Sequence, residues 1–447
     1  MAYNRGSNET WDKWAAIIRD DRWSWKEVEP SYRRNSRLVN GLDEEKVMAA
    51  AHGDGPVELS VAADPYELDR RVIKASKSLG GRFAFNRDLN GGDFVGFSWL
   101  QGAVAKGERV SAATAYLDPL FAEEASNREL DVLLNTEVTR LIQSGTNTGV
   151  PAFRTAEILS PRSKATTTIT ARNEIILSAG VIGTPQILLR SGIGPASHLS
   201  ALNIRTIVDL PSVGANFTDH PMNTLFFRVK QNTTTDPILQ DPTVASQAFA
   251  QWMTTRDGPL AKVAGNTWGF MRLPDDDSVL VRSGDPAAGP SSAHTEMLFG
   301  EGFFPLNDFT MPESGNYITV LSVITSPTSR GSVTLDPSHQ PIINPDYLTS
   351  EFDAHVAVQA MKDIFTFFDA AAFEGYIGSP YGPLKRLMTD SEMLAYVRNY
   401  ATTINHGVGT AKVSRKGEEW GVVDPDLKVK GTRGVRVVDA SIFVSQV

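Results

Sequence analysis

The sequence of 447 residues contains no cysteine. This absence excludes disulfide bridges, thiolate nucleophiles and metal sites with cysteine ligands. It leaves the cellular compartment open, because a secreted protein with a large core does not need disulfides. A run of 18 or more apolar residues is also lacking, so the sequence predicts no membrane span. The first six residues have neither the charged nor the apolar region of a signal peptide, so none is expected in this chain.

Positive charge is not in excess. Lysine and arginine number 43 against 52 aspartate and glutamate residues, a net charge of −9, and no basic block occurs. We therefore expect no nucleic-acid surface. The hydrophobic fraction of 41% and the charged fraction of 21% are typical of a globular protein, and the length suffices for about two or three domains.

Several short motifs are missing as well. The chain has no G-x-G-x-x-G, no P-loop, no H-E-x-x-H and no G-x-S-x-G. The sequence therefore has no motif that indicates a P-loop enzyme, a zinc protease or an α/β-hydrolase. The seven histidines are dispersed, and no two have the spacing of a metal-binding pair on one element. We expect no metal site.

Helix-like and strand-like patterns alternate along the chain without repeats. A tryptophan-rich region at 8–37 predicts short packed helices, and the periodicity of 350–368 predicts a long helix with Glu351 and Asp353 near its start. Strands are predicted at the following ranges: 57–61, 94–100, 130–141 (as one or two strands), 166–170, 174–180 and 434–441. The fold class expected from these patterns is one mixed α/β or α+β unit.

The stretch 174–195 predicts a buried strand, a tight turn and a helix. Thr184 has the character of an N-cap, Pro185 that of the first helical residue, and Gly192 that of a stop signal. The turn and helix N-terminus would offer backbone N–H groups to a phosphate. An ordinary βα unit explains the same spacing.

His406 differs from the other histidines in its surroundings. Gly407 and Gly409 follow it closely, and glycines allow a backbone or a planar ring to approach without a Cβ in the way. An imidazole of near-neutral pKa in such a place suits general-base chemistry.

The stretch 176–195, ILSAGVIGTPQILLRSGIGP, resembles the second signature of the glucose–methanol–choline (GMC) oxidoreductases and departs from it at Val181, where a small residue is usual. Other stretches resemble the family in the same order, so that the resemblance covers essentially the whole chain. They lie at 3–7, 107–117, 213–220, 329–331, 344–348, 402–411 and 438–441. Residues 420–431, 256–260 and 285–290 are most similar to fungal aryl-alcohol oxidases and pyranose dehydrogenases.

The resemblance implies an FAD-dependent enzyme whose full-length parent is secreted. It implies an incomplete Rossmann-like FAD-binding domain and a substrate domain with an antiparallel sheet and helices. Residues 1–225 would form the first part of the FAD-binding domain, 226–404 the substrate domain, and 405–447 the return to the FAD-binding domain. The first βαβ unit with G-x-G-x-x-G, and a second catalytic His or Asn after Val447, would lie outside this chain. Weak FAD binding and little activity are expected on that basis.

The resemblance also assigns site residues. His406 would take the hydroxyl proton of an alcohol while hydride passes to flavin N5, and O₂ or a quinone would then accept the electrons. Asp439 and Ala440 match positions along the flavin and pyrophosphate, and Val138 matches a residue whose backbone meets the adenine. Phe303 and Phe304 would form an aromatic gate over the substrate, although core packing explains such a pair equally well.

Three positions near the base depart from the family pattern. Asn405 replaces an aromatic residue that is usual in aryl-alcohol oxidases, so it would line the substrate site with a polar side chain. Gly407 replaces a usual proline and Val413 a usual methionine, and either change would loosen the hold on His406.

Three functions follow from these observations. The first is oxidation of a primary alcohol, aromatic or allylic, and the second is oxidation of a pyranose or other sugar, which Asn405 favours. The third is a non-catalytic remnant that acts only as a binding protein.

Overall fold

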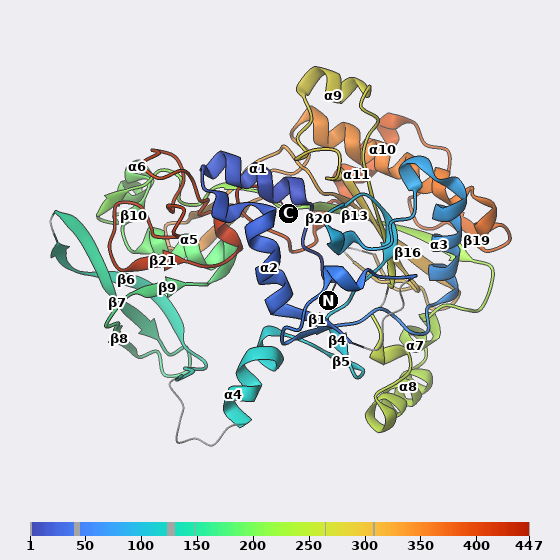
Figure 1. Cartoon of the computed structure of the whole chain (residues 1–447), viewed down its shortest axis with the longest axis horizontal. Coiled ribbons are helices and arrows are strands. Elements are labelled where there is room, and N and C mark those ends of the chain that lie inside the picture. The colour runs from blue at the N-terminus through green and yellow to red at the C-terminus, as the bar shows by residue number, and fades with distance from the viewer. Residues whose placement is uncertain are drawn as a thin grey trace.

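The computed structural model describes residues 2–39, 45–122, 130–147, 149–263, 265–306 and 309–446. It has two lobes, with helices α1 and α2 between them (Figure 1). One lobe contains a large antiparallel sheet, and the other contains a smaller antiparallel sheet beside a parallel strand pair. The expected mixture of helices with an antiparallel sheet is confirmed.

The large sheet has seven strands, in the order β19-β13-β16-β15-β14-β3, with β20 also paired to β13. All of these pairs are antiparallel. The sheet combines β3 with strands that begin at β13, and β13 itself spans the predicted boundary between 225 and 226. The domain boundaries stay a prediction. The strands are β3 (Gly96–Trp99), β13 (Pro221–Val229), β14 (Thr267–Met271), β15 (Thr295–Gly300), β16 (Tyr317–Ile324), β19 (Ile377–Pro380) and β20 (Thr402–Thr403).

Helices α3 (Glu67–Leu79), α10 (Glu351–Phe368) and α11 (Asp390–Tyr400) contribute to the apolar core on one face of this sheet. The predicted helix at 350–368 is confirmed, and the Ser350 side chain caps it by accepting a hydrogen bond from the Asp353 N–H. Side chains alternate along a strand. In β15, Met297 and Phe299 belong to this core, whereas Leu298 packs with the apolar group on the opposite face.

The smaller lobe contains the antiparallel sheet β6 (Glu137–Asn147), β7 (Val150–Leu159) and β8 (Thr166–Thr170). The predicted strand at 130–141 is wrong in its first half, because pairing with β7 starts only at Glu137 opposite Leu159. Leu133 and Leu134 before it are 61% and 74% exposed and belong to no strand. An apolar sequence alone does not make a strand when no neighbouring strand satisfies its backbone groups.

Strand β9 (Ile175–Leu177) pairs in parallel with β21 (Val435–Val437) and leads into α5 (Gly180–Arg190). This helix starts four residues before the predicted N-cap Thr184, so Pro185 lies inside it. Proline has no N–H for the carbonyl four residues earlier. The Thr410 hydroxyl donates to that carbonyl, of Val181, at 2.7 Å. The helix therefore continues through its proline with support from the segment that carries His406.

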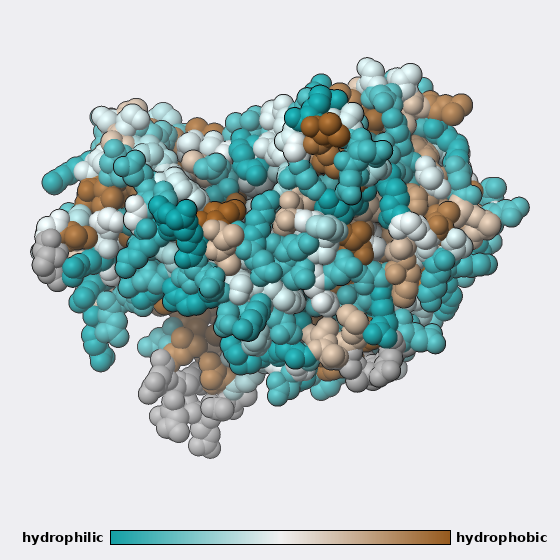
Figure 2. Space-filling model, turned by 45° about the horizontal axis from the view of Figure 1, so that its top comes forward, coloured by the Kyte–Doolittle hydropathy of each residue, from teal (hydrophilic) through white to brown (hydrophobic). Residues whose placement is uncertain are grey.

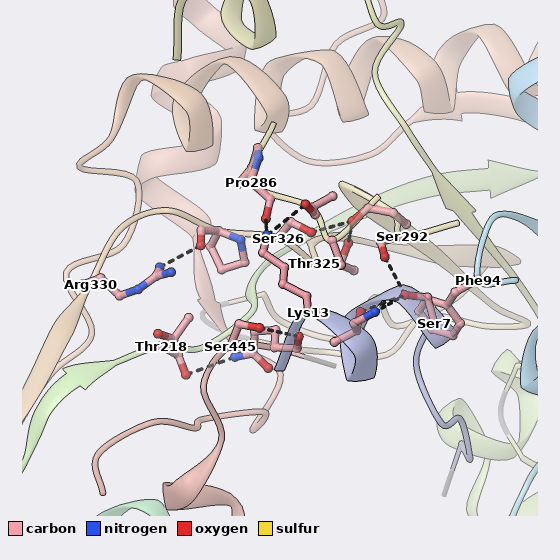
Figure 3. Close-up of a pocket in the computed structure, with 16 residues that line it drawn as sticks. Ser7, Lys13, Phe94, Thr218, Pro286, Ser292, Thr325, Ser326, Arg330 and Ser445 are labelled. Carbon is pink, nitrogen blue, oxygen red and sulfur yellow. Dashed lines mark hydrogen bonds between the residues drawn. The ribbon is translucent and has the colours of Figure 1, made fainter. Parts of the chain in front are cut away.

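The region at 8–37 forms the expected short helices α1 (Asn8–Ile18) and α2 (Trp25–Asn35), and Trp11 and Trp14 are buried. Helix α1 is fixed to the large-sheet lobe at a small hollow of about 70 Å³. Figure 3 shows Lys13 reaching across this hollow, where its Nζ donates to the carbonyls of Pro286 and Ala287. On the other side, the Trp14 indole donates to Ser445 Oγ near the end of the described chain.

Apart from helix α8, the remaining helices and strands are short. No described helix is both long and apolar enough to cross a membrane, and polar residues cover most of the face in Figure 2. The helices are α4 (Asp118–Ala122), α6 (Ala196–Ala201), α7 (Asp236–Gln240), α8 (Pro242–Thr255) and α9 (Ser278–Ser283). The strands are β1 (Ser36–Leu38), β2 (Val57–Leu59), β4 (Val104–Ala105), β5 (Glu108–Arg109), β10 (Ile193–Gly194), β11 (Val208–Asp209), β12 (Ala215–Phe217), β17 (Gly331–Leu335) and β18 (Pro341–Asn344).

The contact between Thr410 and α5 can be tested by substitution. Thr410→Val keeps the volume but removes the hydroxyl that satisfies the Val181 carbonyl, so we expect a loss of roughly 1–3 kcal/mol in the free energy of unfolding. Thr410→Ser keeps the hydroxyl and serves as the matched control. Chemical denaturation measures both variants, and an unchanged stability of Thr410→Val, or a larger loss in Thr410→Ser, would show that this hydrogen bond does not support the helix.

Candidate active site

Two distant segments of the chain meet at His220 and His406. Strand β20 pairs with β13 at Thr403 opposite Pro221, and a second antiparallel bridge joins Val408 to Thr218. Between these two bridges one segment has two residues, 219 and 220, and the other has four, 404–407. The longer segment must bulge, and a bulge re-aims the side chains it carries. His406 lies in this bulge.

The bulge contains a left-handed residue, Asn405, whose φ is 62°. Asparagine tolerates this conformation better than most side chains. The Asn405 N–H donates to Thr403 Oγ1 at 2.7 Å, which closes the turn just before the histidine.

The two imidazoles are in direct contact. His220 Nδ1 lies 3.1 Å from His406 Nδ1, and His220 Nε2 lies 3.0 Å from the carbonyl oxygen of Thr325. A carbonyl only accepts hydrogen bonds, so Nε2 of His220 carries the proton. Its Nδ1 is then the acceptor when the ring is neutral, and His406 Nδ1 must be the donor. These hydrogen bonds leave the lone pair of His406 on Nε2.

Asp219 holds the backbone of both histidines. Its Oδ1 accepts from the N–H of His220 at 2.8 Å and from the N–H of His406 at 3.1 Å, and its Oδ2 accepts from the Tyr347 hydroxyl. On the far side, Gln446 Nε2 donates to the His406 carbonyl at 3.1 Å. His406 is therefore fixed at its N–H, its carbonyl and its ring.

Burial lowers the pKa of both imidazoles. It lowers the pKa of the His220 imidazole to about 3, and the neighbouring His406 adds to that effect. Desolvation also lowers the pKa of His406, against the opposing charge of Asp219. His406 nevertheless keeps part of its surface open to solvent. Both rings are neutral at neutral pH, which is the state that the hydrogen-bond chain requires.

His406 lines a hollow of about 340 Å³. Its walls come from the sheet, from the residues around His406 and from the segments near both ends of the described chain. Asn405, one of the predicted substrate residues, lines it, and so does Ala440. Phe94 and Phe270, whose ring centroids lie 4.1 Å apart, form an aromatic part of the lining.

Phe303 and Phe304 are not among the described residues that line this hollow. Phe303 is fully buried and stacks on Phe226 with a centroid distance of 4.0 Å. Its backbone N–H donates to Asp236, and that of Phe304 donates to Thr319 Oγ1. The structure thus places Phe303 in an aromatic core, the alternative that the sequence left open, and does not bring the pair to His406.

Asp439 joins β21 to the start of α5. Its Oδ2 accepts from the Gly180 N–H at 3.0 Å and from Thr184 Oγ1 at 2.6 Å, and its Oδ1 accepts from the Ser441 N–H. The helix N-terminus that was expected to receive a phosphate therefore receives this carboxylate. Asp439 acts by holding the turn, because both of its oxygens are engaged.

The backbone around this turn fits a bound dinucleotide in other ways. The Ala440 N–H has no acceptor within the described part of the chain. Val138 borders a separate hollow of about 350 Å³ beside β9, together with Ile176, Leu177 and Gly183. An apolar hollow and a backbone donor without an acceptor suit an adenine ring and a polar flavin edge.

The glycine after His406 has a packing reason. A Cβ built on Gly407 would lie 2.7 Å from the ring of Phe217 and 3.1 Å from Cγ1 of Val181. Both unusual residues therefore meet at one contact, where the larger Val181 faces the smaller Gly407. Together with the three hydrogen bonds to His406, this packing opposes the loosening expected from Gly407.

Sequence reasoning missed His220, Asp219 and Thr325 as functional residues. The stretch 213–220 contains Asp219 and His220 and carried part of the family resemblance, so it was the available signal. Nothing local shows that this histidine reaches another one 186 residues away. Thr325 acts through its carbonyl, which no side-chain pattern reveals.

Comparison with known proteins agrees with this architecture. Models of the N- and C-terminal parts of GMC oxidoreductases match residues 1–222 and 327–447. The chain is 36% identical over 99% of its length to "Dehydrogenase eriK" of Hericium erinaceus, covering 75% of that protein. It is 33% identical over 99% of its length to "Pyranose dehydrogenase 2" of Leucoagaricus meleagris, covering 74% of that protein.

Solved structures share the fold. A formate oxidase of Aspergillus oryzae, studied for its FAD modification, matches with a TM-score of 0.87 and 26% identity, over all of this chain and 78% of that one. A fungal aryl-alcohol oxidase matches with a TM-score of 0.82 and 22% identity, over all of this chain and 80% of that one.

The buried state of His220 predicts a pH dependence of stability. The unfolded chain protonates this imidazole below its ordinary pKa of 6.5, whereas the folded chain keeps it neutral down to a pKa of about 3. Stability should therefore fall as the pH falls through this window, by on the order of 4 kcal/mol from this residue. Above pH 6.5 the contribution is fully present.

Urea denaturation at several pH values between 7 and 4 checks this expectation. His220→Gln retains a donor for Thr325 but cannot titrate, so its stability should depend less steeply on pH than that of the unmodified protein. Parallel pH profiles for the two proteins would contradict the assignment.

Proposed function

Because this chain belongs to the GMC oxidoreductase family, we propose that it oxidises the CH–OH group of an alcohol with FAD as cofactor and His406 as the general base. The observation that carries this proposal is the lone pair on His406 Nε2. It has no hydrogen-bond partner among the described residues, and His406 lines the hollow. A neutral imidazole in that state is ready to accept the hydroxyl proton.

The surrounding residues support the proton transfer. When His406 Nε2 takes a proton, the ring becomes positive, and the negative charge of Asp219 stabilises it. His220 stays neutral because its pKa is near 3, so its Nδ1 continues to accept from His406 Nδ1. The Thr325 carbonyl prevents His220 from turning its donor toward His406. His220 thus keeps the same tautomer before and after the transfer, and His406 Nδ1 remains the donor to it.

FAD, when bound, supplies the acceptor for the hydride that leaves the carbinol carbon. Val138 and Ala440 are the residues proposed to hold its adenine and flavin ends, and Asp439 would shape the turn between them. Removal of the hydroxyl proton by His406 makes the alkoxide a stronger hydride donor. O₂ or a quinone as the final electron acceptor, and secretion of the full-length protein, belong to the same proposal.

Two substrate classes remain candidates. A primary aromatic or allylic alcohol is favoured by the Phe94 and Phe270 rings in the lining. A sugar is favoured by the polar Asn405 in the same lining and by the pyranose dehydrogenase among the relatives. A role as a binding protein without catalysis is the outcome in which neither class is oxidised.

Substitution of the base tests the proposal. We expect His406→Ala, loaded with FAD, to lose roughly 10²- to 10⁴-fold in kcat/KM for benzyl alcohol or glucose, whichever is oxidised. His355→Ala is the control, since His355 is partly exposed and contacts Asp277 away from the hollow. Flavin absorbance after gel filtration shows whether each variant retains the cofactor. Full activity in His406→Ala would refute the assignment.

The pH profile gives a second test of the same base. The lowered pKa of His406 means that kcat/KM should rise with pH up to a point below the ordinary histidine value of 6.5 and then stay level. A profile that keeps rising through pH 8 would point to a different base.

A further inference from the structure

Glu296 is a buried carboxyl group without a partner. It lies in β15 between Phe270 of β14 and Val323 of β16, and it is 5% exposed. No hydrogen bond or ion pair to its side chain occurs within the described residues. Buried polar groups in proteins are nearly always satisfied, because an unpaired one costs free energy.

The other buried carboxylates of the described chain follow that rule. Asp69, Asp88, Asp219, Asp236, Glu301, Asp353 and Asp363 each accept at least two hydrogen bonds. Glu301 is the informative contrast, since it follows the same strand and binds both the Tyr376 hydroxyl and the Leu68 N–H. Glu296 stands apart through its environment and not through its residue type.

The place of Glu296 suggests why it has no partner among the described residues. It lines the same hollow as His406, His220 and Asn405. Near it, Phe94 and Phe270 offer apolar surface and no hydrogen-bonding side chain. A carboxyl group so placed is open to a hydrogen bond from a molecule that enters the hollow.

We propose that the Glu296 carboxyl group hydrogen-bonds a hydroxyl group of the substrate other than the one being oxidised. Glu296 is then a specificity-determining residue that selects diols and sugars over alcohols with a purely apolar remainder. This inference rests on the proposed function, because it assumes that the reacting hydroxyl lies at His406. A site built around such a hydrogen bond discriminates strongly against a molecule that lacks the hydroxyl, since the buried group is then left unpaired.

The protonation behaviour of Glu296 agrees with this role. Burial raises its pKa to about 7, so both forms are present near neutral pH. The charged form accepts a hydrogen bond, and the neutral form can also donate one. A hydroxyl group, which is both donor and acceptor, satisfies either form.

The test compares alcohols that differ by one hydroxyl group. The FAD-loaded protein and its Glu296→Leu variant are assayed with 1-butanol, with the 1,2-, 1,3- and 1,4-butanediols, and with glucose. We expect Glu296→Leu to lower kcat/KM on the order of 10- to 100-fold for glucose and at least one diol, and about twofold or less for 1-butanol. Glu296→Gln, which keeps hydrogen-bonding atoms, should lie between the two proteins.

Stability measurements separate this role from a structural one. Glu296→Leu removes an unpaired buried carboxyl, so its melting temperature should stay the same or rise. The control Glu301→Gln disturbs a satisfied carboxyl and should lower the melting temperature while leaving the ratio of diol to 1-butanol activity unchanged. An equal loss of activity on all substrates, or no loss on any, would overturn the proposal.

Binding measurements distinguish failure here from failure of the proposed function. If the unmodified protein oxidises no alcohol, the proposed function fails, and calorimetric titration with glucose and the same diols and 1-butanol decides the role of Glu296 alone. Weaker binding of glucose and a diol, but not of 1-butanol, to Glu296→Leu supports the inference. Unchanged binding of all the compounds contradicts it.

Discussion

Two segments 186 residues apart form a short antiparallel pair, and the arrangement of the candidate active site depends on that pairing. Because one segment has two residues between the bridges and the other has four, the longer one must bulge toward its neighbour. The bulge brings one imidazole against the other, and Asp219 binds the backbone on both sides. Insertion or deletion of one residue in either segment would shift this register and separate the two rings.

Carboxylates fix a turn in one lobe and the start of a helix in the other. Asp439 fixes the turn between β9 and α5 from the neighbouring parallel strand, and Asp353 accepts from the N–H groups of Thr328 and Ser329 at the start of α10. In each case a buried or half-buried charge is paired with backbone donors that would otherwise be unsatisfied. A carboxyl group without such donors is therefore conspicuous in this molecule.

Local sequence predicted the elements whose causes are local. The helix at 350–368 was predictable because its cap, its acidic first turn and its apolar face lie within the segment itself. The start of α5 was not predictable, because the Thr184 hydroxyl that resembled an N-cap is bound by Asp439, 255 residues away. Likewise, Leu130–Leu134 has strand-forming character, but it pairs with none of the described strands.

The candidate site was predictable only in part, for the same reason. His406 could be identified because glycines and a family-like segment surround it, whereas the role of His220 depends on contacts that only the fold creates. For the aromatic pair Phe303 and Phe304, the sequence allowed two roles and could not decide between them. A pair of adjacent phenylalanines fits a substrate gate and a core equally well, and the stacking on Phe226 is invisible in the sequence.

The left-handed backbone at Asn405 has a consequence for enzyme design. Asn405 lines the hollow, so it is an obvious position at which to alter substrate preference. A larger side chain there would also have to hold a conformation that most L-residues adopt only at a cost of about 1 kcal/mol or more. Redesign of this position therefore has to consider the side chain and the backbone conformation together, because the residue chosen at 405 also determines which backbone conformation is accessible.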